Sequence, residues 1–181
     1  MTGDPPAPHI YVAGVEHLRH AESISDAIRI EVELGSIGMA LRPPELIRER
    51  MLGGDALIAV AEGGGSEDWT GFCYLSTWEA GAFVSTSALI VRPEHRGRGL
   101  ARELKTAALL LAERRYPTAR PFGLSTSDAV ARVNLSLGFR EVAYRELPRD
   151  PAFWKGCESC PLHATLLKNH GETCHCRAML R

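Results

Sequence analysis

The feature that most constrains this chain is a strand-like segment followed by a glycine-rich turn and a helix-like segment. The strand-like run extends over Phe83–Val91, the turn contains Gly97 and Gly99, and the helix-like run continues to about Arg114. Glycines let the backbone approach a ligand closely, and the first turn of a helix offers N–H groups without partners. Such a turn binds anions. We therefore expect it to hold a phosphate-bearing cofactor, rather than to be an ordinary glycine-rich turn.

Three known phosphate-binding patterns can be compared with this turn. A P-loop requires a lysine directly after its last glycine, and none follows Gly99. A dinucleotide-binding turn requires a third glycine where this chain has Arg102. The pattern that fits is Arg-x-x-Gly-x-Ala, from Arg96 to Ala101, preceded by Val-x-Pro.

This pattern resembles the acyl-CoA loop of the GNAT acetyltransferases. A second segment, Ser125–Phe139, is similar to a later motif of that family, a short helix that ends in Leu-Gly-Phe. The resemblance covers about residues 8–147. It implies that acetyl-CoA is the co-substrate and that the turn holds its pyrophosphate. The cofactor-binding residues that it implies are Leu89, Ile90 and Val91 along the pantetheine arm, Arg96, Gly97, Arg98, Gly99, Leu100 and Ala101 at the pyrophosphate, and Asn134.

Composition excludes several other classes of protein. The chain has 181 residues, 45% of them hydrophobic and 24% charged, which suits one globular domain. The net charge of −1 gives no general attraction to nucleic acid or to an anionic membrane. No apolar run has the length of a membrane span, and no secretory leader begins the chain. We therefore expect a cytoplasmic location, no nucleic-acid partner and no membrane partner.

The pattern along the chain predicts an α/β (α+β) fold, with helices flanking a mixed, mostly antiparallel central sheet. It matches the element order of the GNAT fold. We expect strands at residues 10–15, 57–61, 70–77, 83–91, 121–125 and 140–144, and helices at 21–34, 45–52, about 100–114 and before Gly138. A turn is expected at Gly63–Ser66. The predicted organisation is a flexible tail at 1–8, a GNAT acyltransferase domain at 9–147, and a cysteine-rich extension at 148–181 that packs on or completes the domain.

The residues that would catalyse acyl transfer are less clearly indicated. Many GNAT enzymes have a carboxylate base at the position of Ser85, and serine is too weak a base. Glu79 is the substitute that we predict, acting through water, although a turn glutamate is also an ordinary surface residue. Asn134 stands where many members have a tyrosine acid, and it cannot supply a proton. Tyr144 is therefore the predicted acid, with Tyr74 and Tyr11 as alternatives.

The C-terminal extension contains four of the five cysteines. Cys157 and Cys160 form a Cys-x-x-Cys pair, and Cys174 and Cys176 form a Cys-x-Cys pair. Two such pairs have the spacing of a tetrahedral zinc site, which would also stabilise a short polar segment. Packed reduced cysteines, disulfides and a redox pair are the competing interpretations.

The extension also resembles that of a bacterial GNAT subgroup of glutamate N-acyltransferases in arginine biosynthesis. The resemblance implies an acidic amino acid as acceptor, whose carboxylates require cations. Arg42, Arg48 and Lys155 are candidates. The predicted function is therefore acyl transfer to the amine of a small molecule, with the α-amine of glutamate as the narrower prediction. The alternatives are an acetyltransferase of a protein amine or antibiotic, and a regulatory module that binds CoA or metal without turnover. A homodimer is one option for the oligomeric state.

Overall fold

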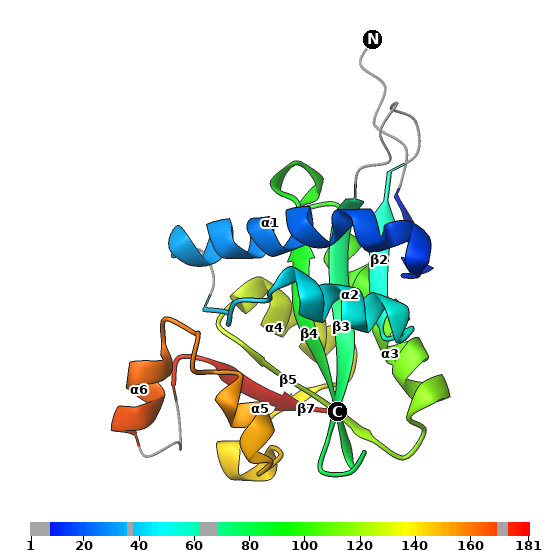
Figure 1. Cartoon of the computed structure of the whole chain (residues 1–181). Coiled ribbons are helices and arrows are strands. Elements are labelled where there is room, and N and C mark those ends of the chain that lie inside the picture. Colours follow the sequence, from blue (N-terminus) through cyan, green and yellow to red (C-terminus); the bar gives the residue numbers. More distant parts are fainter. Residues whose placement is uncertain (1–7, 36–37, 62–68, 170–173) are drawn as a thin grey trace.

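The computed structural model describes residues 8–35, 38–61, 69–169 and 174–181. The predicted tail at 1–8, apart from Pro8, and the predicted turn at Gly63–Ser66 lie outside these residues. The described strands form one mixed sheet of seven strands in the order β1-β2-β3-β4-β5-β7-β6 (Figure 1). The strands are β1 His9–Val12, β2 Ala56–Val60, β3 Trp69–Trp78, β4 Phe83–Val91, β5 Arg120–Ser125, β6 Arg140–Glu141 and β7 Arg177–Leu180. Among these described strands, only β4 and β5 pair in parallel. The predicted fold class is confirmed.

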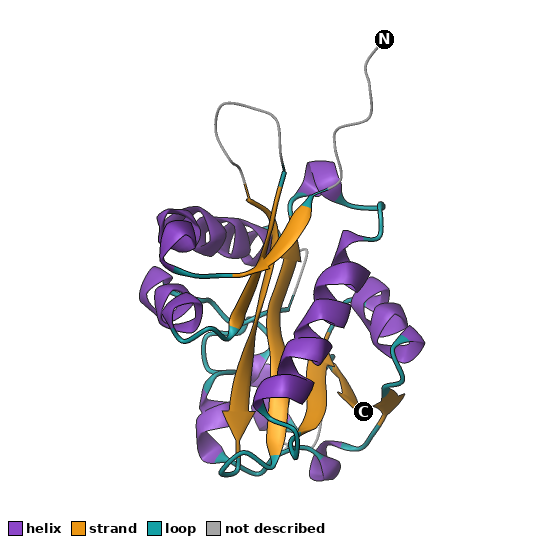
Figure 2. Ribbon diagram, turned by 90° about the vertical axis from the view of Figure 1, so that its right-hand side faces the viewer, coloured by secondary structure: helices purple, strands orange, loops and turns teal. Residues whose placement is uncertain are grey.

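Helices cover both faces of this sheet (Figure 2). One face carries α1 (Ala21–Glu33) and α2 (Pro44–Leu52), and the other carries α3 (Leu100–Arg115) and α4 (Asp128–Ser136). Two short helices, α5 (Pro151–Lys155) and α6 (His163–Lys168), lie beside β7. Three 3₁₀ turns complete the described elements, at Val15–His20, Pro93–His95 and Tyr144–Glu146.

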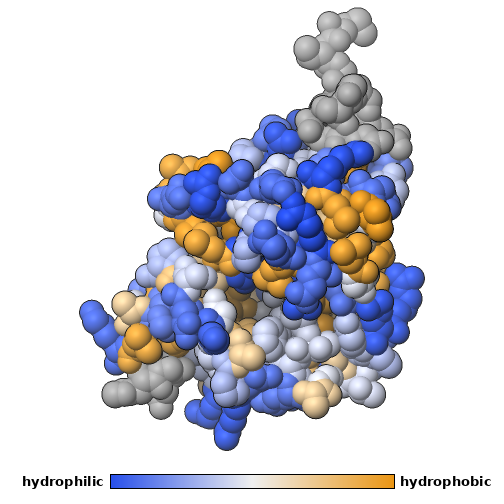
Figure 3. All heavy atoms as spheres, viewed as in Figure 1, coloured by the Kyte–Doolittle hydropathy of each residue, from blue (hydrophilic) through white to orange (hydrophobic). Residues whose placement is uncertain are grey.

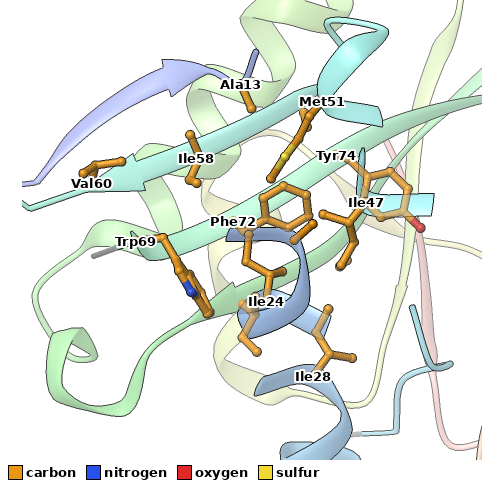
Figure 4. Close-up of a cluster of buried hydrophobic side chains, with 14 of the residues drawn as sticks. Ala13, Ile24, Ile28, Ile47, Met51, Ile58, Val60, Trp69, Phe72 and Tyr74 are labelled. Atoms are coloured by element: carbon orange, nitrogen blue, oxygen red, sulfur yellow. The ribbon is translucent and has the colours of Figure 1, made fainter. Parts of the chain in front are cut away.

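Helix α1 is amphipathic, and its apolar side forms the first core against the sheet. Ile24 and Ile28 are one turn apart on α1, and both are fully buried against Phe72 and Trp69 of β3 (Figure 4). Burial of each such side chain contributes about 1.5–3 kcal/mol. Polar side chains cover much of the outer surface of this layer, which divides its exposed apolar surface into separate patches (Figure 3).

The second core lies between α3 and the sheet, and a glycine determines how closely the helix approaches. A Cβ atom at Gly71 of β3 would stand 2.6 Å from Cδ1 of Leu104. Leu100, Leu104 and Ala108 of α3 are all buried in this layer. The absence of a side chain at Gly71 therefore lets α3, and the loop before it, sit directly on β3.

Strands β4 and β5 pair only at their beginnings and then separate. Their register joins Phe83 to Arg120 and ends at Ser85 and Phe122. Beyond this point β5 continues alongside β7 instead. The edge of β4 from Thr86 onward therefore has no pairing with β5, and a split opens between two central strands.

The C-terminal strand was missed by the sequence pattern. Strand β7 lies between β5 and β6, with Met179 opposite both Gly123 and Glu141. The predicted strand at 140–144 was wrong at its end, because β6 stops at Glu141 and Tyr144 begins a 3₁₀ turn. The first strand was also predicted too long. It ends at Val12, and the Gly14 N–H then donates to Nδ1 of His17 at 3.1 Å, which helps a 3₁₀ turn to begin at Val15.

Candidate active site

The loop between β4 and α3 presents a row of unbonded backbone N–H groups. Gly97 and Gly99 have φ angles of +76° and +90°, in the left-handed region that glycine adopts without strain. Gly99 caps α3 through its carbonyl, which accepts from the N–H groups of Arg102 and Glu103. The N–H groups of residues 97–101 have no hydrogen-bond partner within the described part of the chain. This geometry suits a pyrophosphate, because N–H groups and the positive end of the helix dipole point toward it.

The two arginines of the loop have different surroundings. Arg96 is bonded within the fold, since its Nη2 donates to Oε1 of Glu31 at 2.6 Å and its Nε to the Val91 carbonyl at 2.9 Å. Its side chain therefore fastens the loop to α1 and β4. Arg98 is exposed and has no ion pair among the described residues. Of the two, Arg98 has the guanidinium that is available to an anion.

The β4 edge that leads to the loop is bent by a bulge. Ala88 has a φ angle of +53°, and the register of β3 with β4 shifts between Phe72 and Tyr74. A left-handed alanine is strained, and such strain is common at functional sites. Leu89, Ile90 and Val91 follow the bulge, on the edge that does not pair with β5. The edge predicted to accompany a pantetheine arm therefore borders the split.

Asn134 of α4 has an amide with one unused atom. The residue is 1% exposed, and its Nδ2 donates to Sδ of Met179 at 3.4 Å. Its Oδ1 is buried and has no hydrogen-bond partner among the described residues. A buried acceptor without a partner costs about 1–3 kcal/mol, so an N–H of a bound ligand would relieve that cost.

Sequence reasoning missed Lys105, which lies at the apex of the split. The side chain is 2% exposed, and its Nζ donates a hydrogen bond to Oγ1 of Thr86. Nζ also lies 5.3 Å from the ring centre of Phe139. Burial lowers the pKa of Lys105 from its ordinary 10.5 to about 8, because desolvation disfavours the charged form. The sequence contained a clue, since this lysine directly follows Leu104 on the apolar side of the helix.

The opposite side of β4 carries a row of hydroxyl groups. Oγ of Ser85 accepts from Nε1 of Trp78 at 2.9 Å, lies 3.1 Å from Oγ of Ser87, and donates to the Ser76 carbonyl at 3.3 Å. Ser85 is 3% exposed. Ser85 is thus a hydrogen-bonded hydroxyl that belongs to the packing of Trp78.

The structure does not bring Glu79 together with the loop. Glu79 is exposed in the hairpin between β3 and β4, at the end of the sheet where β4 and β5 are still paired. Its Oε1 accepts the N–H of Arg149, and its own N–H donates to Oδ2 of Asp150 at 3.4 Å. This carboxylate fastens the hairpin to the segment before α5.

Tyr144 is bound to the C-terminal extension instead. Its hydroxyl donates to the Cys176 carbonyl at 2.8 Å and lies 3.1 Å from Sγ of Cys174. Its ring stacks on Trp154 with the centres 5.9 Å apart. Burial, together with the nearby Cys174, raises the pKa of Tyr144, which makes it a weaker acid.

The four cysteines of the extension lie near one another. The N–H of Cys160 donates to the Cys157 carbonyl at 2.9 Å, and the N–H of Cys176 donates to Sγ of Cys174 at 3.3 Å. The pKa values of Cys157 and Cys176 are raised by burial and by the other cysteines. Within the described ranges, no group of three or more His, Cys, Asp or Glu side chains is arranged to hold a metal ion.

The cations predicted for an acceptor carboxylate have separate surroundings. Arg48 forms an ion pair with Glu22. Arg42 lies in the segment between α1 and α2, donates to the carbonyls of Ala40 and Leu41, and has a buried Nε without a partner among the described residues. Lys155 is exposed and lines a surface hollow of about 440 Å³ between α5 and α6. This hollow is lined by residues of the extension and includes none of the loop.

Comparison with known proteins supports the fold. No protein-family model matches the chain, and no curated protein matches it either. Solved structures do match. N-acetylglutamate synthase from Neisseria gonorrhoeae, complexed with coenzyme A and N-acetyl-glutamate, is 18% identical with a TM-score of 0.66, covering 98% of this chain and 35% of that one. This chain therefore spans about a third of the length of that synthase.

Two further structures match over nearly the whole of both chains. Rv2747 from Mycobacterium tuberculosis, in complex with CoA and NLQ, is 14% identical with a TM-score of 0.64, covering 96% of this chain and 98% of that one. A GNAT superfamily phosphinothricin acetyltransferase from Sinorhizobium meliloti, in complex with AcCoA, is 16% identical with a TM-score of 0.64. The match covers 97% of this chain and 88% of that one. At these identities the likeness establishes the fold, which is that of the GNAT acetyltransferases.

A membrane-spanning helix is not found in the described part of the chain, where no helix is both long and apolar enough.

Proposed function

We propose that the protein is an acetyl-CoA-dependent N-acetyltransferase that acylates the amine of a small molecule. The observation that carries the proposal is the continuous path from the β4–β5 split, along the free edge of β4, to the unbonded N–H groups of residues 97–101. These groups would hold the pyrophosphate, with Arg98 beside them, while the β4 edge and Asn134 would bond the pantetheine arm. The matched structures contain CoA or AcCoA in the same fold.

The narrower proposal is that the acceptor is the α-amine of glutamate. It is supported by the matched synthase, which is complexed with coenzyme A and N-acetyl-glutamate, and by the resemblance of the cysteine-rich extension to that of the glutamate N-acyltransferase subgroup. The cysteine-rich extension contacts the segment between α1 and α2, since the Leu41 N–H donates to Oγ of Ser159 at 3.2 Å. Arg42 lies in this segment, and its guanidinium is the cation that we assign to an acceptor carboxylate.

Glu79 and Tyr144 do not enter the proposal as base and acid. Glu79 accepts the N–H of Arg149, and the Tyr144 hydroxyl donates to the carbonyl of Cys176. Replacement of either is expected to reduce stability more than turnover.

The experiment that tests the function measures release of free CoA from acetyl-CoA with a panel of amino acids, other small amines and an antibiotic. Turnover with glutamate alone supports the narrow proposal, and turnover with another amine supports only the broad one. Tight CoA binding without turnover on any acceptor contradicts an enzymatic role and favours a regulatory module.

A pair of glycine variants tests the loop itself. Gly99→Val should weaken CoA binding at least tenfold, because its side chain blocks the approach of the backbone to phosphate. Gly81→Val is the matched control, since Gly81 has the same φ angle of +90° in the hairpin after β3, with no atom within 4 Å of an added Cβ. Equal CoA affinity in the two variants would contradict the assignment of the loop.

We also propose that the four cysteines of the extension bind a structural zinc ion. The proposal is supported by the Cys-x-x-Cys and Cys-x-Cys spacing of these residues. Burial, together with neighbouring thiols, raises the pKa values of Cys157 and Cys176, and a bound divalent cation would lower both by stabilising the thiolates. Metal analysis of the purified protein should give about one zinc per chain. A Cys157→Ser variant should lose the metal, whereas Cys73→Ala, in the sheet, should retain it. Zinc below about a tenth of an equivalent in the wild type would contradict the site.

A further inference from the structure

Lys105 is a buried ammonium group without a negative partner among the residues that the structure describes. None of the carboxylates in the described residues forms an ion pair with it, and its one hydrogen bond goes to the neutral hydroxyl of Thr86. Buried charges in proteins are normally paired, because desolvation of an unpaired charge is costly. If this side chain contributed only packing, an apolar residue of similar size could fill the position without the cost in stability of burying a charge. The position therefore requires another explanation.

The surroundings of Lys105 place its amine at the point where β4 and β5 separate. Ser85 and Phe122 form the last pair of the two strands, so Thr86 and Gly123 are the first residues beyond it. Nζ of Lys105 bonds Thr86, and it would lie 4.0 Å from a Cβ atom on Gly123. The same Cβ would lie 3.9 Å from Nδ2 of Asn134. A lysine and an amide thus flank one spot that Gly123 keeps free of a side chain.

We propose that Lys105 is the catalytic acid that protonates the sulfur of the leaving CoA at this apex. The proposal rests on the acetyltransferase function proposed above. Pantetheine that follows the β4 edge inward from the loop ends at the apex, with its thioester beside Thr86 and Gly123.

The proton and electron balance of the step is complete. The amine nitrogen of the acceptor attacks the thioester carbonyl, and a C–N bond forms. The C–S bond then breaks, its electron pair stays on sulfur, and a proton passes from Nζ of Lys105 to sulfur to give the free thiol. The new amide nitrogen loses one proton, which returns to Lys105 through the Thr86 hydroxyl or solvent. No oxidant, reductant or metal takes part.

The acidity of Lys105 suits this role. Its pKa of about 8 lies close to that of an ordinary thiol, near 8.5, so the proton transfer is nearly balanced. The groups that face the amine are Cys73 of β3, Thr86 of β4, Asn134 of α4 and Phe139. Cys73 alone among them titrates, and burial raises its pKa to about 12. Asn134 can bond the ligand but cannot supply a proton.

A binding experiment tests the proposal without any turnover. The ultraviolet absorbance of the thiolate reports the ionisation of bound CoA as pH is varied, for the wild type, Lys105→Met and Lys105→Gln. Because an adjacent ammonium favours a thiolate, the wild type should lower the thiol pKa of bound CoA by about one unit or more. Neither variant should do so. Lys105→Gln can still donate a hydrogen bond to Thr86, so it separates the positioning role of this side chain from its acidity. Arg114→Met is the control, because it removes an exposed cation from the same helix.

Turnover then completes the test. The Kd for CoA of both Lys105 variants should lie within about threefold of the wild-type value. Their kcat for acetyl transfer should be at least about 100-fold lower, because general acids contribute 10²–10⁴-fold to the rate. The fall of wild-type kcat above pH 8 should also disappear. An unshifted thiol pKa, or a loss of kcat below about tenfold, overturns the role of Lys105. If the thiol pKa of bound CoA is lowered but no amine is acetylated, the placement of Lys105 beside the CoA sulfur is supported and the proposed acetyltransferase function is contradicted. Absence of CoA binding overturns both.

Discussion

Replacing Lys105 with methionine should stabilise the protein at neutral pH. The pKa of this lysine falls from 10.5 in the unfolded chain to about 8 in the fold. A shift of that size corresponds to about 3 kcal/mol of unfavourable burial whenever the amine is protonated. Methionine fills a similar volume without charge, and its cost is the hydrogen bond to Thr86, about 1 kcal/mol. We expect the variant to be more stable by about 2 kcal/mol at pH 7.

The pH dependence of this difference has a definite sign. Between about pH 8 and 10.5 the unfolded lysine binds a proton that the folded lysine has lost, so wild-type stability rises with pH through this window. The advantage of the variant should therefore decline from about +2 kcal/mol at pH 7 to about −1 kcal/mol near pH 10.5. Cys73 acts in the opposite direction. Its folded pKa is raised to about 12, so its contribution is present below the unfolded value of 9 and is lost as pH rises from 9 to 12.

The assay is urea unfolding of wild type and Lys105→Met, side by side at four values between pH 7 and 10.5. The difference between the two proteins removes most of the contribution of Cys73, which is common to both. A variant that is less stable than the wild type at pH 7, or a difference that does not change between pH 8 and 10.5, would refute the reasoning.

Three further substitutions test the packing around the site. Gly71→Ala should cost about 1–3 kcal/mol and lower the Tm, because its Cβ would stand 2.6 Å from Leu104; an unchanged Tm would contradict the close approach of α3. Met179→Ala should cost about 2–5 kcal/mol in urea unfolding, since the side chain is fully buried in β7, and a cost below about 1 kcal/mol would mean that β7 is not part of the core. Tyr144→Phe should lose the bond to Cys176 and lower the Tm by about 2–4 °C, with kcat unchanged; a tenfold fall in kcat would instead make Tyr144 the acid.

Local sequence was sufficient for most of the fold. The predicted helix at 21–34 and the strands at 57–61, 70–77 and 83–91 agree with α1, β2, β3 and β4 within one residue at each end. These elements have strong apolar periodicity and clear glycine or proline boundaries, which are properties of neighbouring residues. The left-handed glycines at 97, 99 and 138 likewise stand where the sequence placed a turn or a helix end.

The candidate site was predictable only in part. The loop was located because a strand, a glycine-rich turn and a helix follow one another directly in the chain. Arg96 was expected to face the anion, yet its guanidinium bonds Glu31, which is 65 residues away. Such a partner cannot be found from the loop sequence, because any exposed glutamate is an equally good candidate until the fold brings one close.

The sequence by itself determined an anion-binding turn, the α/β class and a cysteine-rich end, because each depends on the order and type of adjacent residues. Tertiary structure decided that β7 enters the sheet between β5 and β6, and that β4 and β5 separate after Ser85. It also decided that Lys105 is almost entirely buried at that separation. Strand order, and the burial of one polar residue on an otherwise apolar helix face, depend on segments far apart in the chain. Only their packing determines which side chain meets the split.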